Sequence, residues 1–360
     1  MKSVAVVVGD IGSAAELVPA VAELVRRGVA EVRWFADPTG KAGTNVLEKH
    51  GIPYESRLPN GDDVFSLVLV GASVTACRYQ KEWIYWGRSH GARTMMYEDL
   101  HTTGARPHVL GIDPHVMLVI DEEASRITNR TRPARTLEHV YVVGKPTFED
   151  LPDMIAQRDT IRFRVRAELE VSPYDFLVVY WSAGEAPEQP RVHLDALRDL
   201  GIIDGRRVVF APRLHPKLPD FHELWAHATT GSCATVDARH INNPPEHLSI
   251  AADLVVAAWQ GTGGLRAALL GQHVAIPLFP DDTEKRIAAG HEQGLTPLLR
   301  AKAALPIVSA EQLPSVISRV ITEGDALRAE LCQKAIASFT CLLQPGAVKR
   351  IADAVARELG

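Results

Sequence analysis

Cysteine is scarce in this chain, and its four residues stand far apart, at Cys77, Cys233, Cys332 and Cys341. No CxxC pair occurs, so the sequence predicts neither a disulfide framework nor a cysteine-based zinc site. Two further metal signatures are missing, because no D-x-D occurs and His291-Glu292 lacks the second histidine of H-E-x-x-H. We therefore expect a reaction that uses neither a bound metal nor a cofactor.

Long apolar runs and basic tracts are missing too. No hydrophobic stretch approaches the roughly 20 residues of a membrane span, and no signal-peptide core follows Met1. The formal net charge of the 360 residues is −5, which argues against nucleic acid as the main partner. We expect a cytoplasmic protein with small-molecule partners, and association into a homo-oligomer stays open.

What the chain does contain is best seen in residues 252–279. The apolar run 254–258 predicts a buried parallel strand. Residues 259–264 (WQGTGG) predict a tight turn with open backbone N–H groups, 265–270 a helix, and 273–276 the next strand. In such a βαβ unit the glycine loop lies at the N-terminus of the helix, where the helix dipole favours an anion.

Strands alternate with helices along the first half of the chain. Apolar runs predict strands at residues 3–8, 31–36, 53–55, 65–70, 93–97, 116–120 and 140–143. Amphipathic stretches predict helices at 14–27, 44–50 and 76–90. This alternation predicts a parallel sheet with right-handed crossovers and with ligands at the carboxyl ends of its strands.

The pattern recurs after a charged, proline-flanked stretch at 146–173. Further strands are expected at 175–181, 207–211 and 234–236, helices near 190–200 and 221–227, and a helical tail at 316–320, 326–339 and 347–359. We therefore predict an α/β protein of two doubly wound, Rossmann-like domains that face a cleft. The first would span residues 1–155 and the second 156–344, with the helix at 345–360 packing back on the first.

Three short motifs in this framework point to a family. They are GDIGS at 9–13 after the first strand, an HP pair at 215–216, and ADLVV…GTGG…ALLG at 252–271. Together with the two halves they resemble the GT-B nucleotide-sugar glycosyltransferases, whose organisation is shared by UDP-N-acetylhexosamine 2-epimerases and bacterial glycerophosphotransferases. The stretch 69–146 is similar to uncharacterised transferase-like relatives. The resemblance implies that the first domain holds the acceptor and the second the nucleotide.

The chain departs from this family at Arg266. There the family usually carries a glutamate that binds the nucleotide ribose, in an E-A-x-x-x-G pattern that ends at Gly271. A guanidinium only donates hydrogen bonds, and it prefers a phosphate or a carboxylate. A cation is also unfavourable near the positive end of the helix dipole, by a few tenths of a kcal/mol to about 1 kcal/mol. We expect a bound phosphate, rather than a carboxylate, to offset this charge.

Residues for the donor follow from the second half. Gly261, Thr262, Gly263 and Gly264 would cradle a diphosphate with their N–H groups, although an ordinary βα turn would look alike. Three cations, Arg213, His215 and Lys217, share one proline-bounded loop after a strand, where they could offset charge on a leaving nucleotide diphosphate. That loop could equally be a solvated basic loop. Asp281, with Asp282, could bind sugar hydroxyls, but the sequence PDD is equally typical of a plain turn.

Residues for the acceptor and for proton transfer follow from the first half. The loop with Gly9, Gly12 and Ser13 could hold the acceptor or close over the donor, or it could be a capping turn with Ser13 as the N-cap. A glycosyl transfer needs a general base within reach of the attacking hydroxyl. Asp99 is our first choice because it follows a strand directly, and the other candidates at strand ends are Asp10, Glu98 and His101.

These expectations combine into one functional prediction. The chain would be a metal-independent glycosyltransferase that moves a sugar from a nucleotide-activated donor to a small-molecule or glycan acceptor. Three alternatives stay open: a nucleotide-sugar 2-epimerase or hydrolase, a glycerophosphotransferase-like enzyme, and a non-catalytic nucleotide-binding protein of the same fold.

Overall fold

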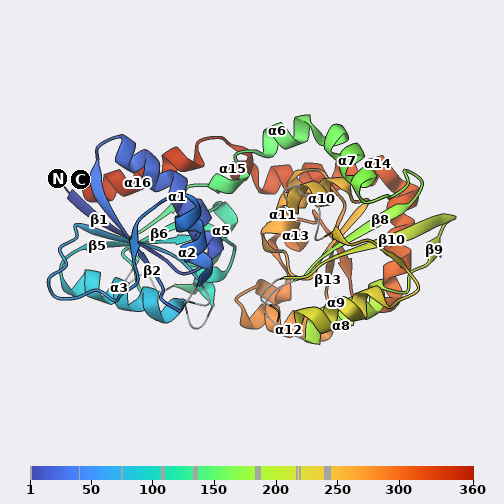
Figure 1. Cartoon of the computed structure of the whole chain (residues 1–360), viewed down its shortest axis with the longest axis horizontal. Coiled ribbons are helices and arrows are strands. Elements are labelled where there is room, and N and C mark those ends of the chain that lie inside the picture. Colours follow the sequence, from blue (N-terminus) through green and yellow to red (C-terminus); the bar gives the residue numbers. More distant parts are fainter. Residues whose placement is uncertain are drawn as a thin grey trace. The chain divides into compact units, whose positions relative to one another are not determined.

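The computed structural model describes residues 2–39, 41–73, 76–106, 109, 111–132, 137–182, 188–215, 218, 220–238 and 245–360. The chain forms two compact units, drawn in Figure 1. Unit 1 comprises Met1–Glu149, Ala288–Gly290 and Cys341–Gly360, and unit 2 comprises Asp150–Ile287 and His291–Thr340.

Unit 1 is built on a parallel sheet of seven strands, counted over the described residues, in the order β3-β2-β1-β4-β5-β6-β7. These strands are β1 (Lys2–Val8), β2 (Ala30–Ala36), β3 (Tyr54–Glu55), β4 (Leu67–Gly71), β5 (Arg93–Glu98), β6 (Val116–Val119) and β7 (His139–Val142). The strand order reverses between β1 and β4. In open parallel sheets, ligands bind beyond the carboxyl ends of the strands at such a reversal.

Helices cover the sheet of unit 1. They are α1 (Ile11–Arg26), α2 (Lys41–Lys49), α3 (Cys77–Ser89), α5 (Glu122–Thr131) and α16 (Ala347–Leu359), with short turns η1 (Thr103–Ala105) and η2 (Pro146–Phe148) and with α15 (Thr340–Leu343) where the chain returns. Helix α16 packs beside α1, although the two lie at opposite ends of the sequence (Figure 1). Arg27 pairs with Asp353 across this contact at 2.6 Å.

Unit 2 repeats the architecture. Over the described residues its sheet runs β11-β10-β8-β12-β13-β14 in parallel, with β9 antiparallel beside β10. The strands are β8 (Phe176–Trp181), β9 (Ile202–Ile203), β10 (Arg206–Arg213), β11 (Ala234–Thr235), β12 (Leu254–Ala257), β13 (Val274–Pro277) and β14 (Leu305–Ile307). Here the order reverses between β8 and β12. All residues of β12 and β13 are buried, as expected for strands covered on both faces.

The helices of unit 2 include three that the sequence did not predict. They are α6 (Leu151–Ala156), α7 (Arg158–Glu168), α8 (Glu188–Leu197), α9 (Phe221–Thr229), α10 (Pro245–Ala251), α11 (Gly261–Leu269), α12 (Pro280–Ala288), α13 (Pro297–Arg300) and α14 (Leu313–Ser338), with turns η4 (Glu292–Gly294) and η5 (Ala310–Gln312). The unexpected helices are α12, α13 and α10, of which α10 lies between β11 and β12 in the chain and contacts α7 and α11.

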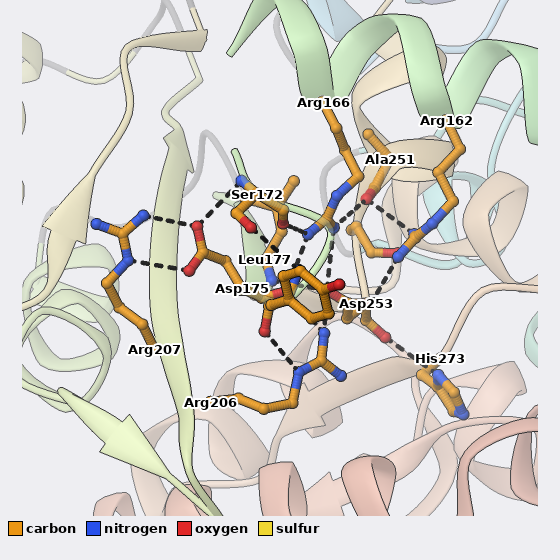
Figure 2. Close-up of polar contacts among 12 residues, drawn as sticks. Arg162, Arg166, Ser172, Asp175, Leu177, Arg206, Arg207, Ala251, Asp253 and His273 are labelled. Carbon is orange, nitrogen blue, oxygen red and sulfur yellow. Dashed lines mark hydrogen bonds and ion pairs between the residues drawn. The ribbon is translucent and has the colours of Figure 1, made fainter. Parts of the chain in front are cut away.

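A cluster of arginines and aspartates holds the amino end of this sheet (Figure 2). Asp175 and Asp253 stand directly before β8 and β12. Asp253 accepts from Arg162 at 2.6 Å and from Arg166 at 3.1 Å, and both arginines belong to α7. Asp175 pairs with Arg207 of β10 at 2.6 Å. The cluster therefore joins α7 and β10 to the amino ends of β8 and β12. Ligands of such sheets bind at the opposite, carboxyl ends of the strands.

Candidate functional site

The glycine run of unit 2 opens helix α11. The sequence predicted a turn at 259–264 and a helix from residue 265, but the helix begins at Gly261, which has φ +50°. Only this first glycine needs the left-handed conformation, so the rest of the run can be helical. Gly264 N–H donates to the Gln260 carbonyl at 3.0 Å. The N–H groups of the residues at 261–263 precede that first helical bond and are free to face an anion.

Close packing explains why glycine occupies the next positions. A Cβ on Gly264 would lie 2.9 Å from the Cβ of Ala257, the last residue of β12. A Cβ on Gly263 would lie 3.2 Å from the indole of Trp181, the last residue of β8. The start of α11 is therefore held directly above the ends of β8 and β12, at the strand-order reversal.

A cavity of about 210 Å³ opens at this place. Its lining comes from the end of β8, from α10 and from α11: Trp181, Glu246, Ser249, Thr262, Gly263, Arg266, Ala267 and Leu270. The indole Nε1–H of Trp181 donates to the hydroxyl of Ser249 at 3.0 Å, which fixes the ring. The cavity thus combines an aromatic ring, two hydroxyls, a carboxylate and a guanidinium.

The prediction that a bound phosphate offsets the charge of Arg266 is wrong, because carboxylates of the chain itself offset this charge. Its guanidinium is buried and donates to the carboxylate of Asp150, and it lies 3.8 Å from a carboxylate oxygen of Glu246. Two acidic side chains therefore surround the cation. The reason for the error is that Asp150 is 116 residues away in sequence, so only the fold brings it to α11.

The cationic loop after β10 is only partly described. Arg213 is the last residue of β10, and His215 follows it by two residues. Ser182, just after β8, connects to both: its N–H donates to the Arg213 carbonyl at 3.1 Å, and its hydroxyl accepts from the His215 N–H at 2.6 Å. Lys217 and Pro216 lie outside the described residues. Arg213 and His215 therefore stand at the carboxyl end of β10, beside the end of the neighbouring strand β8, where Arg213 is in register with Trp181.

The two aspartates at 281 and 282 have separate surroundings. The sequence PDD begins helix α12 and does not form the plain turn that was one reading of it. Asp281 is exposed on the first turn of this helix. Asp282 is buried and bonds to His193 Nε2 at 3.0 Å, and His193 Nδ1 bonds to the Tyr180 hydroxyl at 2.9 Å. Only Asp281 is exposed enough to meet a ligand.

In unit 1 the GDIGS segment begins helix α1. Asp10 is the N-cap: its carboxylate accepts from the Ser13 N–H at 3.1 Å and from the Ser13 hydroxyl at 3.0 Å. The reading of Ser13 as the N-cap is therefore wrong by three positions, since the helix starts at Ile11 and not at 14. Gly9 and Gly12 flank the cap. A Cβ on Gly12 would lie 2.2 Å from a carboxylate oxygen of Asp99, so this glycine makes room for that side chain.

Asp99 follows β5 directly and is 92% shielded from solvent. Burial raises the pKa of its carboxyl to about 7, with further increase from the charges of Asp10 and Glu16, while Lys145 opposes the shift. The Lys145 ammonium instead donates to the backbone carbonyl of Asp99 at 2.7 Å and pairs with Glu16 at 2.7 Å. Within the described part of the chain, the Asp99 carboxyl has no hydrogen bond of its own.

The neighbouring candidates for the general base, Glu98 and His101, form hydrogen bonds with other residues of unit 1. Glu98 is buried, accepts from the Gly104 N–H at 2.9 Å, and burial raises its pKa. His101 is buried and bonds to Asp121 at 2.8 Å. Of the acidic and imidazole groups at the strand ends of unit 1, Asp99 therefore combines a pKa near neutrality with a carboxyl that can still accept a proton.

Sequence reasoning missed five residues of the cavity: the apolar Ala267 and Leu270, and the aromatic or polar Trp181, Glu246 and Ser249. Trp181 could have been found, because it ends a predicted strand that carries ligand-facing positions at its carboxyl end. Glu246 and Ser249 lie on α10, whose short apolar pattern did not predict a helix.

Two searches of the described residues found nothing. No helix among them is both long and apolar enough to cross a membrane. In the same set, no group of three or more histidine, cysteine, aspartate or glutamate side chains is placed to hold a metal ion.

The architecture matches known structures although the sequence does not. No protein-family model matches the chain, and no characterised protein matches its sequence. The Staphylococcus aureus MnaA–UDP complex superposes with a TM-score of 0.66 at 12% identity, over 99% of this chain and 96% of that one. The Neisseria meningitidis UDP-GlcNAc 2-epimerase bound to UDP-GlcNAc gives 0.63 at 12%, over 99% and 100%.

A glycosyltransferase is similar as well. Acinetobacter baumannii MurG gives a TM-score of 0.58 at 15% identity, over 99% of this chain and 100% of that one. This chain has the GT-B fold. The resemblance inferred from the short motifs is thereby confirmed at the level of the fold, and identities this low carry it no further.

Proposed function

We propose that the protein is a nucleotide-sugar glycosyltransferase, with the donor nucleotide in the cavity of unit 2 and the general base in unit 1. GT-B neighbours that hold UDP or UDP-GlcNAc support this class of donor. The first N–H groups of α11 suit the diphosphate, because a helix N-terminus carries partial positive charge and unpaired donors. Trp181 offers its ring to the base.

The ribose is assigned to Glu246. The family position for this contact is Arg266, which cannot accept a hydroxyl proton and is already occupied by carboxylates. Glu246 lines the same cavity from α10 and keeps a quarter of its side chain exposed. Its carboxylate can accept from the ribose hydroxyls while Arg266 holds it in place, so the acidic group has moved from one helix to the next.

The transfer step uses groups at the strand ends. Asp99 removes the proton from the acceptor hydroxyl as this oxygen attacks the anomeric carbon of the donor sugar. The bond between that carbon and the diphosphate oxygen breaks, and Arg213 and His215 offset the charge that develops on the leaving diphosphate. Gly12, which contacts Asp99, belongs to the side that receives the acceptor. Asp281 is assigned to sugar hydroxyls.

The raised pKa of the Asp99 carboxyl is the observation that supports a catalytic function and not nucleotide binding alone. A carboxyl with a pKa near 7 exists half as base and half as acid at neutral pH, which is the best compromise between availability and proton affinity. A non-catalytic protein would gain nothing from a shielded carboxyl without a hydrogen-bonding partner.

The test combines binding and turnover. Thermal shift with UDP, CDP, GDP, dTDP and CMP identifies the nucleotide, since stabilisation follows binding to the native state. Glu246→Gln is expected to weaken the chosen nucleoside diphosphate about tenfold and to leave inorganic pyrophosphate, which has no ribose, unchanged. Glu223→Gln, on the surface of α9, is the matched control. Equal loss for pyrophosphate would contradict the ribose assignment.

Asp99→Asn separates catalysis from binding. We expect unchanged nucleotide affinity and a turnover lowered by about 10²- to 10⁴-fold, the usual contribution of a general base. Asp62→Asn, an exposed change in unit 1, should keep wild-type turnover. Unchanged turnover in Asp99→Asn would leave the nucleotide-binding role and remove the proposed chemistry.

A 2-epimerase is the second candidate, because two of the matched structures are of that type or bind UDP in the same fold. Asp99 would then exchange a proton with the sugar itself. Incubation of the nucleotide sugar in deuterated water without an acceptor distinguishes the two: an epimerase releases a deuterated epimer, whereas a transferase leaves the donor unlabelled.

A further inference from the structure

A second cavity in unit 2, of about 300 Å³, shares no residue with the nucleotide cavity. It lies beside β14, the edge strand of the sheet, and takes walls from α13 and α14. Leucine dominates these walls, at Leu278, Leu295, Leu299, Leu305, Leu327 and Leu331. A polar ligand in contact with such walls would lose its hydrogen bonds to water without replacement, so the cavity suits an apolar group.

A kink in α14 keeps the cavity open. The helix is interrupted at Gly324, whose φ of 46° and ψ of −122° are not helical. Arg319 lines the cavity before the kink, and Leu327 and Leu331 line it after the kink. Because the helix changes direction between them, its two parts cannot close over the sheet edge together.

Cations surround the apolar walls. The lining includes Lys302, Arg319 and Lys334 against one carboxylate, that of Glu330. Lys334 pairs with Glu330, and Arg319 pairs with Glu323 at 2.8 Å. The ammonium of Lys302 has no ion pair within the described part of the chain. The cavity therefore carries one positive charge that no neighbour neutralises.

The backbone of Lys302 ends helix α13. Its φ is +54°, in the left-handed region that costs a residue with a Cβ about 1 kcal/mol or more. Glycine or asparagine would occupy this position more easily. Lys302 follows the C-cap of α13, and its N–H donates to the Leu299 carbonyl at 3.0 Å while the Ala303 N–H donates to the Leu298 carbonyl at 2.9 Å, so the left-handed conformation is that of a helix end and fixes the place of the lysine at the cavity.

We propose that this cavity binds an amphiphile with a single alkyl chain and one anionic head group. The chain lies against Leu299, Leu305 and Leu331, and the head lies at Lys302. Burial of the chain supplies most of the affinity, and the lysine selects an anion over a neutral head. The site is separate from the proposed nucleotide site and does not depend on it.

Isothermal titration calorimetry with decanoate tests the proposal directly. Decanoate is expected to bind, decan-1-ol at least fivefold more weakly, and butanoate without measurable heat, because it lacks the chain. Decyl phosphate shows whether a phosphate head is preferred to a carboxylate. Raised salt should weaken decanoate more than decan-1-ol, since salt screens only the charged contact. Equal affinity for acid and alcohol would overturn the assignment of the head group.

Two variants locate the site. Lys302→Asn removes the charge in a residue type that tolerates positive φ, so it should keep or raise the melting temperature while lowering decanoate affinity at least fivefold. Glu170→Asn is the control, because Glu170 also has positive φ, at +55°, and lies in unit 2 outside the cavity. Leu331→Phe fills the cavity and should abolish binding. Wild-type affinity in Lys302→Asn, or displacement of decanoate by a nucleotide, would overturn the proposal.

Discussion

At the residue scale, the raised pKa of the Asp99 carboxyl affects both the proposed catalysis and the stability of the fold. Its pKa in the folded protein is about 7, against 3.8 for an ordinary aspartate. A carboxyl whose folded pKa is raised binds a proton more tightly when folded, so the protein loses stability as pH rises from about 4 to 7. The ionised form costs up to about 4 kcal/mol above pH 7, at about 1.36 kcal/mol per pKa unit.

We predict that a variant without the Asp99 carboxylate is more stable than the wild type although it has lost activity. Asp99→Asn removes the charge that burial disfavours, so it should raise the free energy of unfolding by a few kcal/mol at pH 8.5 and by roughly a third as much at pH 5. Urea unfolding at the two pH values measures the difference. The kcat/KM of the wild type should rise with an apparent pKa near 7. A stability gain independent of pH would show that the carboxyl is not the titrating group.

For Arg266 we predict the opposite effect, a loss of stability when the residue is changed. Arg266→Glu would place a third carboxylate beside Asp150 and Glu246, so the empty protein should lose about 3 kcal/mol of unfolding free energy. The estimate is at the low end for a buried pair because half of the Asp150 side chain is exposed. Arg266→Met, which removes only the charge, should cost less. Chemical denaturation decides this, and a variant as stable as wild type would disprove the structural role.

At the element scale, two adjacent glycines of helix α11 have different roles. Gly264 packs against the strand β12, and Gly263 lines the proposed nucleotide cavity. Gly264→Ala brings a methyl group within 2.9 Å of Ala257, and this overpacking of helix on strand should cost about 1–3 kcal/mol. Gly263→Val points at Trp181 and should abolish nucleotide-induced stabilisation with a smaller loss of fold. Melting temperatures with and without nucleotide test both. Full nucleotide binding in Gly263→Val would make the helix start purely structural.

Element prediction from the sequence succeeded where the apolar pattern was long. The parallel strands followed because runs such as Val4–Val8 and Leu67–Val70 are buried on both faces and need no partner information. The start of α11 was placed four residues late, since glycine is a poor helix former by propensity and only the close contacts with Trp181 and Ala257 explain the glycines there. Helix α10 was missed because its seven residues are too few to show a period.

At the scale of the whole molecule, unit 1 is closed by the C-terminal helix. Helix α16 buries Ile351, Val355 and Leu359, and the Lys2 ammonium donates to the terminal carbonyl of Gly360 at 2.6 Å. At about 1.5–3 kcal/mol per buried aliphatic side chain, removal of this helix takes away roughly 5 kcal/mol, a large part of the stability of one domain.

A chain that ends at Gln344 should therefore lose protection in unit 1 alone. Hydrogen–deuterium exchange is expected to quicken in α1 and β1 while β8 and β12 keep their protection and nucleotide still stabilises unit 2. Lys349→Ala, an exposed change on α16, should leave both units protected. Equal loss of protection in the two units would contradict the division of the chain into separately stabilised parts.

The fold class could be derived from residues close together in the chain. Alternation of apolar strands with amphipathic helices and the glycine run after Ala257 are local properties, and they suffice for two doubly wound α/β halves and for the strand ends where ligands bind, while GT-B was implied only by the resemblance of short motifs to that family. The partners of individual side chains are not local. Asp150 reaches Arg266, Gly12 makes room for Asp99, and Trp181 lies under Gly263 only after the strands have taken their order. Burial and charge pairing depend on those distant neighbours, so the pKa of Asp99 and the role of Arg266 were decided by the tertiary structure.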